Sequence, residues 1–202
     1  MRGMALDPIL TAQELSALRG VALFDCRPEE AAYHAGHIEG ALHAQLERDL
    51  SAPALEPAQG GRHPLPSVRE FCGRLGRWGV TPGTHAVAYD DQKGANAAAR
   101  LWWMLRALGH GAVRVVDGGL PALVAAGFRL TSEVPALAAA PRYPADIWQW
   151  PLADIDEVER ARLDPARRGA FESASSNERL KTPRSHASAS SKARARAAST
   201  TP

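Results

Sequence analysis

The chain has 202 residues, enough for one ordinary domain and a shorter additional segment. Hydrophobic residues make up 45% of it, which is sufficient for a buried core. No stretch approaches the roughly 18 consecutive apolar residues of a membrane-spanning helix. The N-terminus lacks the apolar core of a signal peptide, and there are only two cysteines. We therefore expect a cytoplasmic protein with no disulfide framework and no membrane partner.

The formal net charge of +2 conceals a division along the chain. Residues 166–202 contain eight basic and two acidic residues, a net charge of +6, so residues 1–165 carry −4. Ser, Ala, Arg, Thr and Pro dominate this basic tail. Because it cannot bury enough apolar surface to offset its ordering entropy, we predict disorder for residues 169–202. It also has no helical pattern, so we favour a solvated tail and expect no nucleic-acid partner.

Before the tail, segments with strand and helix patterns alternate along the chain. Thr11 with Glu14, and Ser67 with Glu70, match the capping box that starts a helix. The predicted elements, in order, are helix 11–19, strand 21–25, helix 28–35, helix 67–78, strand 86–89, helix 97–108, strand 113–116 and helix 120–126. This alternation with short turns predicts an α/β fold with a mainly parallel sheet flanked by helices, over residues 6–135.

Residues 136–151 are rich in Ala and Pro and contain Trp148 and Trp150. We interpret them as an interdomain-type linker that lies against a protein surface, because tryptophans rarely remain in water. The following segment, 152–168, contains one further predicted helix at about 154–163.

The loop after strand 86–89 consists of Asp90, Asp91, Gln92, Lys93 and Gly94 and opens onto a helix N-terminus. Such loops form anion cradles from converging backbone N–H groups and the helix dipole. A thiol enzyme would place a cysteine at the strand end, but this chain has two carboxylates there. With no neighbouring histidine and no metal-ligand spacing, we favour helix capping over a general base or a metal ligand, and we expect no metal or cofactor. Lys93 and Gly94 could retain weak anion binding, against the two negative charges.

Six stretches together resemble the rhodanese/3-mercaptopyruvate sulfurtransferase family, specifically the first of its two tandem domains. They are, in order, 23–27 (LFDCR), 36–41 (GHIEGA), 61–66 (GRHPLP), 89–91 (YDD), 100–106 (RLWWMLR) and 116–119 (VDGG). The resemblance covers about residues 6–135 and, more weakly, the chain to Leu163. Glu39 departs from it, because the family usually has proline there.

The resemblance implies a rhodanese-like fold and an inert first domain. In the family, the second domain supplies the catalytic cysteine in a loop like the one after Tyr89, and Asp90 stands at that position here. Segment 152–168 then resembles the start of a second domain. Cys26, at the end of a buried strand, and Cys72, on the apolar face of a helix, are not expected to replace the missing nucleophile.

The resemblance also identifies His63 as a contributor to a two-domain site, with Glu47 as its acidic partner. We weigh this role evenly against a structural one. His37 is expected to be a buried hydrogen-bonding residue. One of Trp102 and Trp103 is expected to face the sheet and the other the missing domain. Arg100 and Arg106 are expected to form surface or interdomain ion pairs.

The leading hypothesis is a sulfurtransferase homologue reduced to its non-catalytic first domain and inactive alone. The family transfers sulfur from a small donor, thiosulfate or 3-mercaptopyruvate, to a thiol or cyanide acceptor through a cysteine persulfide. The missing second domain, or self-association through the face it leaves bare, is the expected partner. Two alternatives are a non-catalytic binding or regulatory module, and a truncated or frameshifted product without function.

Overall fold

The computed structural model describes residues 7–54 and 61–164. The predicted tail disorder therefore concerns residues outside the described ranges. The described residues belong to two units, which are divided between Leu152 and Ala153.

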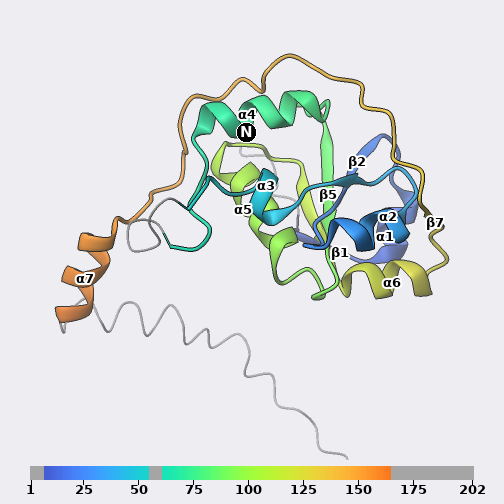
Figure 1. Ribbon diagram of the computed structural model, residues 1–202, viewed down its shortest axis with the longest axis horizontal. Helices are drawn as coiled ribbons and strands as arrows, with labels where there is room; N and C mark the ends of the chain where they lie inside the picture. Colours follow the sequence, from blue (N-terminus) through green and yellow to red (C-terminus); the bar gives the residue numbers. More distant parts are fainter. Residues whose placement is uncertain (1–6, 55–60, 165–202) are drawn as a thin grey trace, which may run out of the picture. The chain divides into compact units, whose positions relative to one another are not determined.

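The first unit is built on a five-stranded sheet in the order β1-β6-β5-β2-β4, in which every neighbouring pair is parallel (Figure 1). Its strands are β1 (Ile9–Leu10), β2 (Val21–Asp25), β4 (Leu42–His43), β5 (His85–Tyr89) and β6 (Val113–Val116). A separate antiparallel pair joins β3 (His37–Ile38) to β7 (Leu130–Thr131). The predicted α/β fold with a mainly parallel sheet is confirmed.

Helices cover both faces of this sheet, as Figure 1 shows. They are α1 (Ala12–Ala17), α2 (Glu30–Ala35), α3 (Leu46–Asp49), α4 (Val68–Arg77), α5 (Ala97–Ala107) and α6 (Gly119–Ala125). Successive β5 side chains point to opposite faces. Ala86 and Ala88 pack with α4 and α5, whereas Val87 and Tyr89 pack with α1 and α6. Because both faces are covered, the central strand is apolar throughout rather than alternating.

The two predicted capping boxes are present. The Thr11 and Ser67 hydroxyls accept from the backbone N–H groups of Glu14 and Glu70, and each glutamate carboxylate accepts from the backbone N–H of its capping residue. The predicted helix at 28–35 begins two residues later, at Glu30. Strands β1, β3, β4 and β7 and helix α3 were not predicted, because elements of two to four residues carry no periodic pattern.

The segment after β7 returns along α4 and α5. Its backbone N–H groups at Ala140, Tyr143 and Gln149 donate to carbonyl oxygens of Gly76 (2.8 Å), Cys72 (3.1 Å) and Ala107 (2.6 Å). A Cβ atom at Gly76 would lie 2.8 Å from the Pro141 carbonyl oxygen, so glycine permits this close approach. Residues 136–151 therefore lie against the domain.

The linker tryptophans complete this contact. Trp148 lies 5.9 Å from Phe71 and 6.0 Å from Trp103, measured between ring centroids. Trp150 lies 6.0 Å from Trp102 and 6.1 Å from Trp103. Both α5 tryptophans therefore contact the linker. That one of them also faces a missing domain stays a prediction.

In the second unit, α7 (Ile155–Leu163) confirms the predicted helix. The Asp154 carboxylate caps it by accepting from the Glu157 N–H at 2.6 Å. None of the helices within residues 7–54 and 61–164 has the length and apolar character needed to cross a membrane.

Candidate functional site

Asp90 lies directly after β5, and its side chain fills the cradle that follows. The residue is 1% exposed. Oδ1 accepts from the N–H groups of Gln92 (2.9 Å) and Gly94 (2.7 Å). Oδ2 accepts from the N–H groups of Asn96 and Ala98, both at 3.2 Å, at the start of α5. The predicted capping role is confirmed. These N–H groups are already bound to a carboxylate, which leaves Lys93 and Gly94 no basis for binding a second anion there.

The loop backbone is tightly constrained around this carboxylate. Lys93 (φ 61°) and Gly94 (φ 83°) both adopt the left-handed conformation. A Cβ atom at Gly94 would lie 2.5 Å from Val115 Cγ1, so glycine is required sterically as well. Asp91, Gln92 and Lys93 are exposed. The five predicted loop residues therefore divide into two buried ones that form the cradle and three on the surface.

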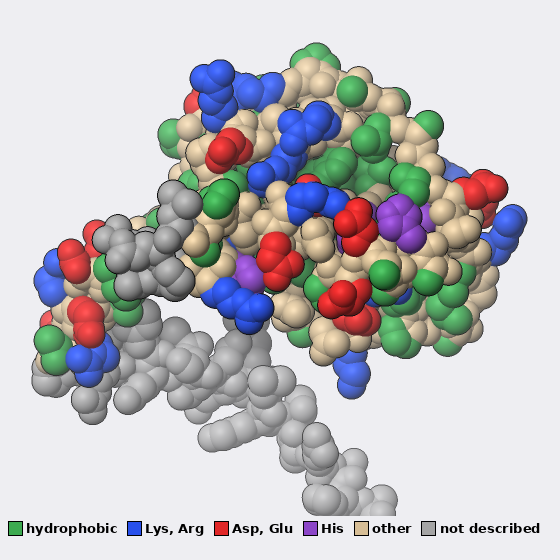
Figure 2. All heavy atoms as spheres, viewed as in Figure 1, with side chains coloured by type: hydrophobic (Ala, Val, Ile, Leu, Met, Phe, Trp, Pro, Cys, Tyr) green, Lys and Arg blue, Asp and Glu red, His purple; other side chains and the backbone are tan. Residues whose placement is uncertain are grey.

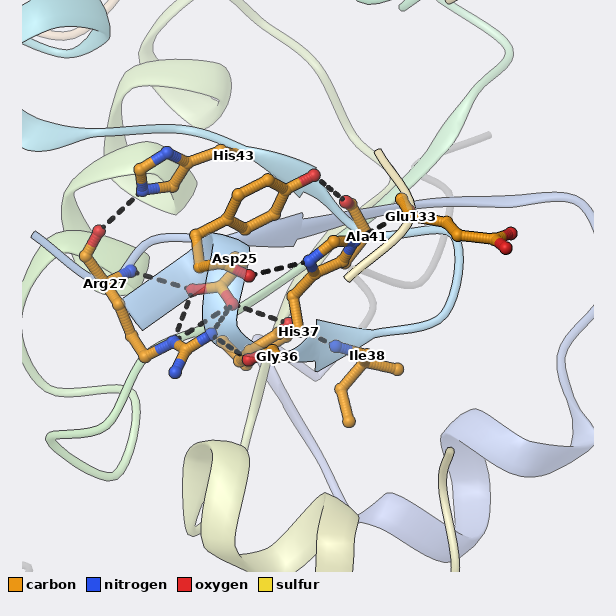
Figure 3. A network of polar contacts seen from close by, with 10 residues as sticks. Asp25, Arg27, Gly36, His37, Ile38, Ala41, His43 and Glu133 are labelled. Atoms are coloured by element: carbon orange, nitrogen blue, oxygen red, sulfur yellow. Dashed lines mark hydrogen bonds and ion pairs between the residues drawn. The ribbon is translucent and has the colours of Figure 1, made fainter. Parts of the chain in front are cut away.

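A buried polar network connects the ends of β2 and β5 beneath the loop (Figure 3). Arg27 Nη2 lies 2.7 Å from Asp25 Oδ2, and Arg27 Nε donates to both carboxylate oxygens at 3.0 Å. The Tyr89 hydroxyl donates to Asp25 Oδ2 at 2.8 Å and accepts from the Ile38 N–H at 3.1 Å. Burial opposes the Arg27 charge, but Asp25 outweighs it and raises the pKa of the guanidinium. The network holds Tyr89, and hence the start of the cradle, in place.

His37 extends this network, as its predicted buried role requires. Its Nδ1 lies 2.9 Å from the Tyr33 carbonyl oxygen and its Nε2 3.1 Å from that of Glu133, which ties β3 to the segment after β7 (Figure 3). The Tyr33 ring stacks on His37 (3.9 Å) and on His43 (4.6 Å). Burial, followed by the charge of Asp25, raises the pKa of Tyr33 to about 12. These side chains support the site and are not free to react.

His63 and Glu47 are not joined by a hydrogen bond or ion pair in the part of the chain that the structure describes. His63 is partly buried and lies between α3 and α4, whereas Glu47 is exposed on α3. Their pairing stays a prediction.

The backbone at His63 is held by Arg100, whose Nη2 donates to the His63 carbonyl oxygen at 2.9 Å. Arg106 Nη1 donates to the carbonyl oxygens of His110 (3.5 Å) and Gly111 (3.2 Å). Neither arginine forms the expected surface ion pair within the described ranges, and an interdomain ion pair stays a prediction. Both guanidiniums bind carbonyl groups instead. The helical spacing of the two arginines does not indicate which chain segments supply these carbonyl groups.

Neither cysteine offers a reactive thiol. Cys26 and Cys72 are both 0% exposed. Burial raises the pKa of Cys72, and burial together with Asp25, Asp90 and Asp49 raises that of Cys26 well above its ordinary value. The thiolate, which is the nucleophile in sulfur chemistry, is disfavoured at both positions. Within residues 7–54 and 61–164, no cluster of three or more His, Cys, Asp or Glu residues is placed to hold a metal ion.

Two open cavities lie near these elements. One of about 250 Å³ is lined at its rim by Glu30, His34 and Arg48. These charges pair with one another, since Glu30 lies 3.4 Å from Arg48 and 3.8 Å from His34. Figure 2 shows hydrophobic side chains at the base of a hollow, with interspersed basic and acidic side chains around it. A second, more apolar cavity of about 310 Å³ adjoins the cradle through Lys93 and Gly94.

Comparison with known proteins agrees with this fold and loop arrangement. A family model described as a rhodanese-like domain matches residues 11–126. The chain belongs to this family. A Pseudomonas aeruginosa protein named "Probable 3-mercaptopyruvate sulfurtransferase" is 44% identical over 140 residues, 64% of this chain and 49% of that protein. The thiosulfate sulfurtransferase of Gallus gallus is 36% identical over 144 residues, 70% of this chain and 42% of that protein.

Solved rhodanese structures give the same picture. The 3-mercaptopyruvate sulfurtransferase from Leishmania major superposes with a TM-score of 0.62 at 31% identity, over 69% of this chain and 40% of that one. SseA from Escherichia coli superposes with a TM-score of 0.60 at 24% identity, over 82% of this chain and 68% of its own, and supports the fold alone. The rhodanese-like chain thus spans about half the length of the curated relatives that it matches.

Sequence reasoning missed the partners of Asp25 and Arg100. The spacing of Asp25 and Arg27 at a strand end was a usable signal for the first, because alternate residues there point to the same side. Nothing in the sequence linked Arg100 to carbonyl groups about 40 to 50 residues away.

Proposed function

We propose that this rhodanese-like chain is the non-catalytic half of a sulfurtransferase. In this proposal it contributes His63 and a supporting face to a cysteine-bearing rhodanese domain, which transfers sulfur from thiosulfate or 3-mercaptopyruvate to a thiol acceptor. The observation that carries the proposal is the Asp90 carboxylate. It occupies the cradle from within, at the strand end where a nucleophilic thiol would stand.

The chain alone is then inactive, because a persulfide requires an accessible and activated thiolate. The expected result is that the purified chain transfers sulfur from thiosulfate to cyanide no faster than its Cys26→Ser, Cys72→Ser double variant. Mass spectrometry after incubation with thiosulfate should find no persulfide on either cysteine. Turnover above the double variant, together with a persulfide on Cys26 or Cys72, would contradict inactivity.

The apolar cavity beside the cradle supports a partner on this side of the domain. Ile9, which lines it, is 54% exposed, and Trp102 and Val115 form further parts of its wall. Interfaces between domains bury roughly 600–1,500 Å². We therefore expect either binding of a separate cysteine-bearing rhodanese domain or, in its absence, self-association.

Sedimentation velocity over a range of concentrations tests this partner. The part of the Pseudomonas aeruginosa relative that this chain does not match, added in trans, should shift the chain to a heterodimer and give turnover that His63→Ala lowers. Ile9→Glu should weaken the association, whereas Val124→Glu on α6 is the control, since Val124 is 45% exposed and Ile9 54%. A chain that stays monomeric at all concentrations and does not bind the added domain would contradict the proposal.

The alternative of a module that recognises acidic groups through the cradle loses its physical basis. All four N–H groups that face Asp90 are already engaged by its carboxylate. A ligand anion would first have to displace the Asp90 carboxylate, which is part of the chain itself.

A further inference from the structure

One guanidinium group joins both ends of the segment that leads to His63. Arg100 lies in the first turns of α5. Its Nε donates to the Leu50 carbonyl oxygen at 3.0 Å. Its Nη2 donates to the carbonyl oxygens of His63 at 2.9 Å and Pro64 at 3.3 Å. Leu50 directly follows α3, whereas His63 and Pro64 lie shortly before α4. This one side chain therefore binds both ends of the segment that connects α3 to α4.

Further hydrogen bonds hold the two ends of this connecting segment together. The Ala52 N–H donates to the Pro64 carbonyl oxygen at 3.0 Å, so this oxygen is shared with Arg100. Arg74 on α4 donates from Nη1 to the Asp49 carbonyl oxygen at 2.7 Å. The last carbonyl groups of α3 therefore face two cations, Arg74 and Arg100. Positive charge at the C-terminus of a helix stabilises the helix. Hydrogen bonds from a charged donor are stronger than neutral ones, so the two ends are held firmly.

The same helix also begins at the cradle. The N–H groups of Asn96 and Ala98 bind the Asp90 carboxylate, and Arg100 follows within one turn. Because α5 is a continuous hydrogen-bonded helix, Arg100 fixes the position of the His63 backbone relative to the cradle. Burial lowers the pKa of Arg100, because desolvation disfavours the charged guanidinium. The carbonyl oxygens of Leu50, His63 and Pro64 accept from it where water is partly excluded.

We propose that Arg100 is the positioning residue of His63 and fixes it relative to the cradle and to α3. The structural part stands on the contacts above, and its catalytic consequence rests on the proposed function. The planar fork of arginine places two nitrogens on carbonyl oxygens from two segments at once. A lysine ammonium carries its three donors on one nitrogen, so it does not reproduce the fork that places Nε and Nη2 on the two segments.

The test compares Arg100→Lys and Arg100→Gln with the control Arg106→Gln. Arg106 lies on the same helix and also binds two carbonyl groups, but these belong to His110 and Gly111 and not to the segment that carries His63. Amide hydrogen exchange at Ala52 should accelerate at least tenfold in both Arg100 variants. The His63 imidazole resonances should change their chemical shifts, while the control leaves both readouts unchanged. Arg100→Lys retains charge and chain length, so it keeps the experiment informative if Arg100→Gln does not fold.

Unchanged Ala52 exchange and unchanged His63 imidazole chemical shifts in Arg100→Lys would overturn the proposal. So would equal changes in Arg106→Gln, which would indicate general loosening of α5. With a cysteine-bearing domain in trans, Arg100→Lys should reduce turnover as much as His63→Ala, and the double variant should lose no more. If His63→Ala leaves that turnover intact, the proposed function fails while the exchange and chemical-shift data still decide the positioning role.

Discussion

The cradle after β5 and the segment that carries His63 are tied to the same helix, but they differ in what is left free. In the cradle, the Asp90 side chain takes up the converging N–H donors and is buried. At His63, the backbone is bound by Arg100 and the side chain is only partly buried. The cradle therefore has a structural role, whereas at His63 the contact with Arg100 fixes only the backbone. The predictions below test this difference.

The largest effect is expected beneath the cradle, at the buried carboxylate of Asp25. Asp25→Ala leaves the Arg27 guanidinium buried without its charge partner and the Tyr89 hydroxyl without its acceptor. Removing one partner of a buried ion pair costs about 3–5 kcal/mol. Urea denaturation should show a loss of this size. Asp91→Ala, at an exposed position one residue beyond Asp90, should change stability by less than about 0.5 kcal/mol. A small effect of Asp25→Ala would show that the network does not support the cradle.

The next largest effect concerns the cradle itself. Asp90→Ala should cost about 2–4 kcal/mol, because several buried N–H groups lose their acceptor and each unsatisfied group costs roughly 1–3 kcal/mol without full additivity. Added thiosulfate should then bind the vacated cradle and restore stability. The gain is about 2.7 kcal/mol at a ligand concentration 100 times the dissociation constant.

Thermal unfolding with increasing thiosulfate measures this rescue. Asp91→Ala is the control, because it corrects for the general effect of the salt on protein stability. Equal salt responses in the two variants would mean that the cradle is not an anion site even when empty.

The smallest effect is a pH dependence at the linker contact. His110 is 1% exposed, and its Nδ1 lies 3.0 Å from the Tyr143 hydroxyl of the linker. Burial lowers the pKa of His110, and also that of neighbouring His85. The unfolded chain therefore takes up protons below about pH 6.5, where the folded protein does not. Stability from these groups is complete above that pH and is lost as the pH falls towards the folded pKa.

Urea midpoints between pH 7.5 and 5 measure this loss, which cannot exceed about 1.4 kcal/mol per pH unit for each histidine. His110→Gln should flatten the profile. An identical slope in His110→Gln would exclude this histidine as the cause.

Local signals in the sequence determined much of the fold. The capping boxes at Thr11 and Ser67, the apolar run of β5 and the helical spacing of α4 and α5 each lie within about ten residues, and all appear in the structure. The cradle and its cap were predictable for the same reason. Asp90 binds N–H groups no more than eight residues away, so strand, loop and helix N-terminus imply the contact.

Tertiary structure alone decided what lies far apart in the chain. The two-residue strands form only because a neighbouring strand offers hydrogen-bond partners, as β3 does with β7. The tryptophans of α5 contact the linker because residues 136–151 fold back over that face. Arg100 selects the carbonyl groups of Leu50 and His63 instead of an ion pair because packing places those two segments beside α5. Contacts over such sequence distances depend on the assembled core, which no local pattern encodes.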